Sequence, residues 1–166
     1  MDQGLLIRNP GLTPEEFSKH WYTVHAPLVV PMFLYLGVRN YEQIHAPFDL
    51  PSSSSTLNTS TFDGVVALPP PPLSGILPEG IPRWVQAYYD EVVKVDEKRF
   101  LVSEALKHIV RVTPGSVGGD VRVVIGEGKV LVDVPERVWQ VWRGYEEQSG
   151  KEEEDEEGNA VVSKEA

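Results

Sequence analysis

The order in which strand-like and helix-like segments follow one another is the feature of this sequence that most restricts its fold. Short apolar or alternating runs are typical of strands, and longer runs with apolar residues every three or four positions are typical of helices. A helix is predicted to open at residue 13 and to be broken or restarted by two later prolines. Further helices are expected over 84–95 and 135–145. The predicted strands cover residues 4–8, 39–45, 62–68, 121–125 and 129–134.

This order, β-α-β-β-α-β followed by one more helix, predicts an α+β fold of the ferredoxin-like kind. The first helix has the clearest start signal, because Thr13 can cap it, Pro14 fits its first turn and Glu16 completes a capping box. The prolines that follow, Pro27 and Pro31, are expected to interrupt it. A sheet of this kind leaves one face open, and a second copy commonly covers it. We therefore expect a homodimer.

The sequence divides into a predicted domain, 1–145, and an acidic tail, 146–166. Within the domain, residues 47–60 and 69–82 read as proline-rich loops, and residues 103–120 read as an insertion before the last strands. The tail holds nine acidic and two basic residues, so it carries −7 of the net charge of −10. Its run of six acidic residues repels itself and lacks apolar partners, which predicts disorder.

Composition excludes several classes of function. The absence of cysteine excludes disulfide scaffolds, thiolate catalysis and cysteine zinc sites. The predicted domain has a charge of −3 and no basic stripe, which argues against nucleic-acid binding. No apolar run approaches the ~20 residues of a membrane span, and no nucleotide-binding glycine motif is present. We expect a cytoplasmic protein that uses no metal or other cofactor and binds neither nucleic acid nor membrane.

Several segments between residues 4 and 134 resemble the EthD family. The opening match runs from Arg8 to Phe17 and continues through His20-Trp21 and the segment from His25 to Val29. Later agreement follows in the same order, at Tyr41-Glu42-Gln43-Ile44-His45, Phe62-Asp63-Gly64-Val65-Val66 and Asp96-Glu97-Lys98-Arg99-Phe100-Leu101. The segment Val123-Val124-Ile125-Gly126-Glu127 resembles the family's closing strand region.

The resemblance implies a dimeric α/β-barrel of ferredoxin-like subunits, with an active site in the cleft between sheet and helices. It also implies chemistry without a cofactor. Fungal members of the family commonly act in aromatic polyketide pathways as dehydratases or decarboxylases, and related barrels oxidise anthrones without metal or flavin. The long loops differ from the family pattern, and loops of this kind affect the choice of substrate.

Two histidines on the first helix are candidate catalytic groups, because imidazole titrates near neutrality. His20 and His25 lie on either side of the apolar stripe that includes Trp21, at positions that match the family's histidines. Their wide angular separation argues against one shared metal, and zinc-type HxxxH spacing is absent. Two structural interpretations remain open: a surface pair of His20 with Glu16, and a capping role for His25.

The strand at 39–45 presents an unusual row of polar side chains. Tyr41, Gln43 and His45 project to one face together with Arg39, because strand side chains alternate. Unpaired buried polar atoms cost about 1–3 kcal/mol each, so this face is either open to solvent or the polar wall of a ligand cavity. Asp63, in the neighbouring strand candidate, could orient an imidazole, act as a base, or simply form a turn.

Aromatic residues supply the remaining candidate contacts with a ligand. Trp84 and Tyr88 could stack a flat aromatic molecule, as could Tyr89, although core or dimer packing explains them equally well. Trp21 belongs to the apolar stripe of the first helix and is also a candidate to contact substrate.

These residues suit proton transfer in a partly dry pocket. We expect a cofactor-independent lyase, foremost a dehydratase acting on an aromatic polyketide intermediate, in which His25 or His45 transfers the proton and Tyr41 and His20 donate to substrate oxygens. Alternatives are decarboxylation of a β-keto acid, cofactor-free oxygenation of an anthrone-like compound, and non-catalytic binding of an aromatic molecule.

Overall fold

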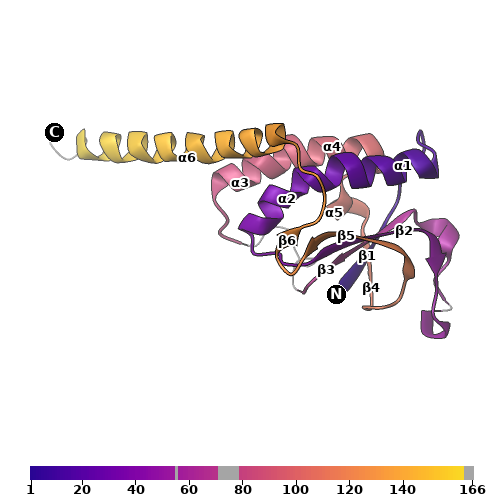
Figure 1. The fold of residues 1–166 in the computed structure, drawn as a ribbon. Coiled ribbons are helices and arrows are strands. Elements are labelled where there is room, and N and C mark those ends of the chain that lie inside the picture. Colours follow the sequence, from indigo (N-terminus) through magenta and orange to yellow (C-terminus); the bar gives the residue numbers. More distant parts are fainter. Residues whose placement is uncertain (55, 71–78, 163–166) are drawn as a thin grey trace.

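The computed structural model describes residues 1–54, 56–70 and 79–162. Helices pack on one face of an antiparallel sheet of six strands that differ in length (Figure 1). The strand order is β4-β1-β3-β2-β5-β6, and every neighbouring pair is antiparallel. The first four strands in this order form the ferredoxin-like arrangement, which confirms the predicted fold class. The strand bounds are Asp2–Leu6 (β1), Tyr41–Asp49 (β2), Gly64–Leu68 (β3), Val110–Val112 (β4), Gly118–Gly126 (β5) and Lys129–Val130 (β6).

The first helical arm runs without a break from Pro14 to Tyr35. It consists of α1 (Pro14–His20), a π-helical segment (Trp21–His25) and α2 (Ala26–Tyr35). The predicted capping box is present: the Thr13 side chain accepts from the backbone of Glu16, and the Glu16 carboxylate accepts from the backbone of Thr13.

The interruption predicted at the two prolines of this arm is wrong. Pro27 lies in the first turn of α2, directly after the π-helical segment, where a missing N–H is tolerated. Pro31 stands inside α2, which continues to Tyr35. Burial of most of the α2 side chains against the core keeps the helix intact despite the lost hydrogen bond.

The second helical arm runs from Arg83 to Phe100. It consists of α3 (Arg83–Tyr88), a π-helical segment (Tyr89–Val93) and α4 (Lys94–Phe100). One short helix, α5 (Ala105–His108), follows it. A short 3-10 turn at Ser52–Ser54 lies in the predicted loop 47–60, and a second at Thr59–Thr61 overlaps the end of that loop. Residues 71–78 of the predicted loop 69–82 lie outside the described residues.

The fourth strand of the ferredoxin-like sheet was misplaced by the sequence pattern. It is β4, which lies inside the segment 103–120 that was read as an insertion and which pairs with β1. The predicted hairpin at 121–125 and 129–134 exists as β5 and β6, but it adds to the opposite edge, beside β2. A three-residue strand gives too short an alternation to be recognised from sequence.

The last helix is longer than predicted. α6 spans Glu136–Val162, so the backbone is helical through most of the acidic segment that we expected to be disordered from residue 146. Glutamate and lysine favour helix, and a helix already anchored by packing is extended at little cost. Its anchored end is held by Trp142, whose ring packs against those of Trp84 and Tyr88.

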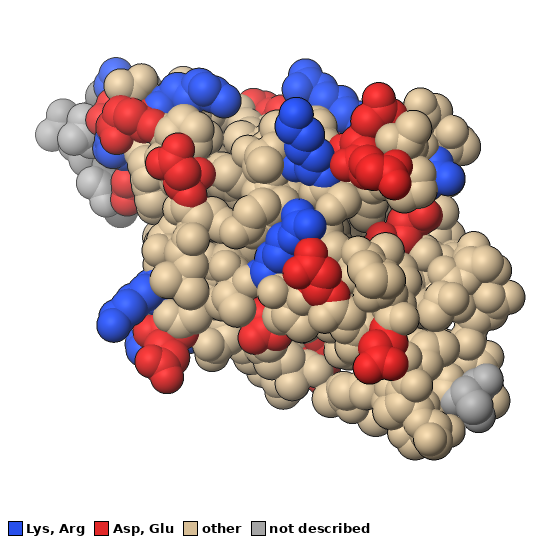
Figure 2. All heavy atoms as spheres, turned by 45° about the vertical axis from the view of Figure 1, so that its right-hand side comes forward, with Lys and Arg blue, Asp and Glu red and all other residues tan. Residues whose placement is uncertain are grey.

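Two apolar layers enclose the sheet. The larger lies between the helices and the sheet, and the smaller lies on the other face, where Leu5, Ile44 and Val65 pack with Phe62 and Val117. On the face shown in Figure 2, acidic and basic side chains are interspersed rather than gathered by sign. Among the described residues, none of the helices has the length and apolar character needed to span a bilayer. The homodimer stays a prediction.

Candidate functional site

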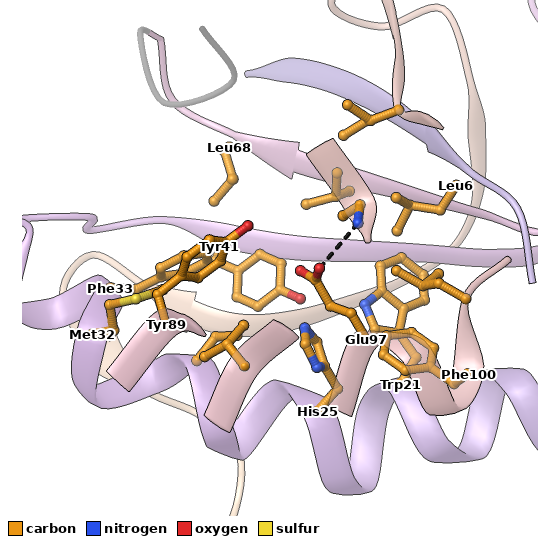
Figure 3. A pocket seen from close by; sticks show the side chains of 16 residues that line it. Leu6, Trp21, His25, Met32, Phe33, Tyr41, Leu68, Tyr89, Glu97 and Phe100 are labelled. Carbon is orange, nitrogen blue, oxygen red and sulfur yellow. Dashed lines mark hydrogen bonds between the residues drawn. The ribbon is translucent and has the colours of Figure 1, made fainter. Parts of the chain in front are cut away.

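A cavity with a volume of about 50 Å³ lies between the helical arms and the sheet. Its wall is mostly apolar, and five side chains bring polar atoms to it: His25, Tyr41, Tyr89, Glu97 and the indole N–H of Trp21. Figure 3 shows His25, Glu97 and Trp21 directed toward the same part of this space, with Glu97 held by a backbone contact. The apolar lining comprises Leu6, Val29, Met32, Phe33, Val66, Leu68, Val93, Phe100, Leu101, Ala105 and Ile109.

Both helical arms become π-helical where they cover the cavity. Trp21 and His25 are the first and last residues of one π-helical segment, and Tyr89 and Val93 are the first and last of the other. A π-turn inserts one extra residue per turn and so redirects the side chains that follow it, which is why such segments are frequent at functional sites. Here all four end residues line the cavity.

His25 is held by a buried carboxylate on the facing helix. Its Nδ1 lies 2.9 Å from Oδ2 of Asp96, and Nε2 of His20 lies 2.9 Å from Oδ1 of the same residue. Because a carboxylate accepts, Nδ1 of His25 carries a hydrogen, which leaves Nε2 as the acceptor in the neutral ring. Burial raises the pKa of Asp96, but hydrogen bonds and charge from His25 and His20 outweigh burial and lower it overall.

Glu97 follows Asp96 on α4 but points into the cavity. It is 3% exposed, and one of its oxygens accepts from the backbone N–H of Ala105 at 3.0 Å. Burial raises the pKa of Glu97, and this effect outweighs the opposing influence of His25 and the Ala105 N–H. Neighbouring carboxyl groups are thus driven apart in pKa, with Asp96 held ionised and Glu97 biased toward its protonated form.

The polar face predicted on the strand at 39–45 is a buried wall and not a solvent face. Tyr41 lines the cavity, and its oxygen accepts from Nε2 of Gln43 at 2.8 Å. Oε1 of Gln43 lies 3.0 Å from Nε2 of His45, whose Nδ1 lies 2.7 Å from the Ser18 hydroxyl. Arg39 precedes the strand and donates to the carbonyl of Glu127 instead.

Burial changes the acidity of both ring residues on this wall. It raises the pKa of Tyr41, although the hydrogen bond from Gln43 opposes this, so the phenol stays protonated. Burial, reinforced by the positive charge of Arg122, lowers the pKa of His45 to about 4. His45 is therefore neutral near pH 7, and it packs against the ring of Trp21 behind the cavity wall rather than lining the cavity.

Four other predicted site residues lie away from the cavity. His20 stacks on the ring of Phe100 and reaches the site only through Asp96. Asp63 forms an ion pair with Arg8 and also accepts from its backbone N–H, so it holds the segment that follows β1 rather than an imidazole. The aromatic pair proposed to stack a ligand, Trp84 and Tyr88, instead anchors α6.

Sequence reasoning did not assign a role to the two carboxylates of the site. Asp96 and Glu97 were noted only as part of the family-like segment, and both lie inside α4. The available signal was the segment 96–101, which belongs to the family-like pattern and begins with these two acids. Among the residues that the structure describes, no group of three or more metal-ligating side chains is arranged to hold an ion.

Comparison with known proteins identifies the family. The model of the EthD domain matches residues 9–104, which include His25, Tyr41, Asp96 and Glu97. The chain belongs to the EthD domain family. No curated protein and no solved structure matches it.

Proposed function

We propose that the protein is a cofactor-independent lyase that dehydrates a flat β-hydroxy carbonyl compound, of the kind found among aromatic polyketide intermediates. The observation that carries the proposal is the pairing of a carboxylate-held imidazole with a buried, protonation-prone carboxyl group in one apolar cavity. Two titratable groups whose environments separate their pKa values suit the roles of base and acid.

His25 acts as the base in this proposal. Its Nε2 removes a proton from the carbon next to the substrate carbonyl, and the electron pair of the broken C–H bond moves toward the carbonyl oxygen to form an enolate. Asp96 holds the ring in the required tautomer and stabilises the imidazolium that forms. The hydroxyl of Tyr41 donates to the enolate oxygen, where negative charge develops.

Glu97 completes the reaction as the acid. The enolate electrons form the new C=C bond while the C–O bond to the hydroxyl breaks, and the Glu97 proton leaves with that oxygen as water. The proton that His25 took from the substrate then passes to the Glu97 carboxylate, because the charges of the two residues attract each other. The protein is thereby regenerated, and the net change is the loss of one water from the substrate.

The lining supports an apolar, flat substrate. Aromatic and aliphatic side chains make up most of the wall, and they keep water away from the enolate. A ligand with one or two rings needs more room than about 50 Å³, so side chains must move to admit it. Met32 is the most adaptable of the lining residues, because its side chain is unbranched and has three rotatable bonds.

The test uses a small model substrate, 3-hydroxy-1-tetralone. Loss of water from this β-hydroxy ketone gives naphthalen-1(4H)-one, which becomes aromatic by tautomerising to 1-naphthol. The naphthol is followed by its fluorescence without added metal or nucleotide. We expect the purified protein to form 1-naphthol and the His25→Gln and Glu97→Gln variants to form it much more slowly. Formation of 1-naphthol at the rate of buffer alone contradicts the proposal.

Two parallel measurements separate the competing reactions. Oxygen uptake together with product formation from anthrone favours oxygenation, and release of carbon dioxide from 1-naphthol-2-carboxylic acid favours decarboxylation. Decarboxylation needs the donors but no base, so it would survive in the His25→Gln variant. Tight binding of 1-naphthol with no turnover of any of these compounds favours a non-catalytic binding protein.

A further inference from the structure

We propose that Ser18, His45 and Gln43 are positioning residues that direct the hydroxyl hydrogen of Tyr41 into the cavity, so that the site selects ligands with a carbonyl or other acceptor oxygen at this point. The inference rests on the proposed function, and it adds the residues that determine which ligands the site prefers. None of the three positioning residues lines the cavity, yet together they form a chain of side-chain contacts that ends on Tyr41.

The backbone of Trp21 fixes the orientation of this chain. Nε2 of Gln43 lies 3.1 Å from the carbonyl oxygen of Trp21, which can only accept a hydrogen bond. The NH₂ group of the Gln43 amide must therefore face this carbonyl, and its oxygen must face the other way. A flipped amide would place two acceptors against each other inside the core, where Gln43 is fully buried.

The fixed amide in turn fixes the tautomer of His45. Because Oε1 of Gln43 accepts, Nε2 of His45 must carry the hydrogen of the neutral ring. Nδ1 is then the acceptor, and the hydroxyl of Ser18 donates to it at 2.7 Å. The charged groups that influence this ring are Arg122 and Asp120, and the neutral state of His45 near pH 7 agrees with the assignment.

The same amide orients Tyr41 at the other end of the chain. Nε2 of Gln43 donates to the phenol oxygen at 2.8 Å, and the Trp21 side chain, which can only donate, also hydrogen-bonds to it. A phenol hydrogen prefers the ring plane, so it turns away from these two donors, toward the space that Tyr41 lines. Among the described residues, the Tyr41 hydroxyl donates to no protein acceptor, which leaves it available to a ligand oxygen.

The chain acts by orientation and does not transfer protons. An amide conducts a proton poorly, and Gln43 stands between His45 and Tyr41. His45 is also too weak a base near pH 7 to activate the Ser18 hydroxyl as a nucleophile. The contribution of the three residues is therefore to make Tyr41 a donor in the ligand-free protein, before any substrate arrives.

The test compares 1-tetralone with tetralin, which differ by one carbonyl oxygen. Neither can lose water, so the measurement does not depend on turnover. We expect wild-type protein to prefer 1-tetralone and to lower its carbonyl stretching frequency on binding, because Tyr41 donates to that oxygen. Ser18→Ala should reduce the preference by roughly fivefold to tenfold, the size of one hydrogen bond, and should weaken the frequency shift. Thr23→Ala is the matched control, since Thr23 donates to its own helix backbone at Lys19.

A measurement on unmodified protein covers the case in which a variant fails to fold. Nitrogen NMR of the histidine rings should show His45 neutral with its hydrogen on Nε2. A hydrogen on Nδ1, or equal loss of 1-tetralone and tetralin binding in Ser18→Ala, overturns the inference. Absence of dehydration of 3-hydroxy-1-tetralone overturns the proposed function alone, because the carbonyl shift and the tautomer are observed without it.

Discussion

Nδ1 of His25 lies 2.9 Å from Oδ2 of Asp96, and this contact decides which nitrogen of the imidazole is free to act in the cavity. The two residues come from facing helical arms, with His25 at the end of a π-helical segment and Asp96 inside α4. A second imidazole, that of His20, occupies the other oxygen of the carboxylate. Asp96 therefore has its orientation fixed from both sides.

Replacing Asp96 with asparagine tests the importance of this orientation. If the amide oxygen accepts from His20, the amide nitrogen faces His25 and donates to Nδ1, which moves the ring hydrogen to Nε2 and removes the base. We expect kcat for 3-hydroxy-1-tetralone to fall by about 10²- to 10⁴-fold with a smaller change in KM. Asp90→Asn, a change at an exposed carboxylate paired with Lys94, serves as the control and should leave kcat unchanged.

Glu97→Gln tests the acid. The amide oxygen can still accept from the Ala105 N–H, but the side chain no longer supplies a proton. Because the pKa of Glu97 is raised, the wild-type group stays protonated to higher pH than an ordinary glutamate and loses activity as pH rises through that pKa. The variant should have a lower kcat and should lack this high-pH decline in its pH–rate profile. A decline that persists unchanged in the variant assigns it to another group.

The sequence pattern pointed to His25 and to the polar strand face at the cavity, but not to the two carboxylates. His25, Tyr41 and Trp21 were predicted because helical spacing and strand alternation show which side chains share a face. Asp96 and His25 are 71 residues apart, and their contact depends on how two helices pack, which periodicity within each helix does not report. The π-helical segments make the contact still harder to predict, because each changes the register of the helix and so changes which side chains share a face.

The same limits explain the errors in the fold. The order of the longer elements predicted the ferredoxin-like arrangement, because those elements have clear periodicity. β4 has only three residues and was missed, and the aromatic pair Trp84 and Tyr88 faces α6, a helix outside the family-like region. A helical stripe shows that residues are buried together, but it does not show whether a ligand or another helix buries them.

His45 should make stability depend on pH. In the folded protein its pKa is lowered from 6.5 to about 4, so between these values the unfolded chain binds more protons. The contribution of neutral His45 to the free energy of unfolding is complete above pH 6.5 and is lost as pH falls toward 4. Between pH 7 and pH 5, the free energy of unfolding should fall by about 2 kcal/mol. Urea unfolding at both pH values should show this loss in wild type and a smaller one in His45→Gln. Equal losses in both proteins would mean that His45 is not the group responsible.

Trp142→Ala tests how α6 is attached to the domain. The ring is 7% exposed and contacts the rings of Tyr35, Trp84 and Tyr88. Removing a buried tryptophan ring leaves a cavity, and we expect the free energy of unfolding to fall by about 3–5 kcal/mol in urea titrations. Val141→Ala changes the adjacent, exposed position of the same helix and should cost less than about 1 kcal/mol. Similar losses for the two variants would contradict the packing described here.

The central claim is that His25, oriented by Asp96, removes a proton from the carbon beside a carbonyl group. Exchange of the C2 hydrogens of 1-tetralone for deuterium in heavy water measures this step alone, since the compound has no hydroxyl to lose. Mass spectrometry should show faster exchange with wild-type protein than with buffer, and exchange at the buffer rate with His25→Gln. Exchange by His25→Gln as fast as by wild type, or no acceleration by wild type, would contradict the account.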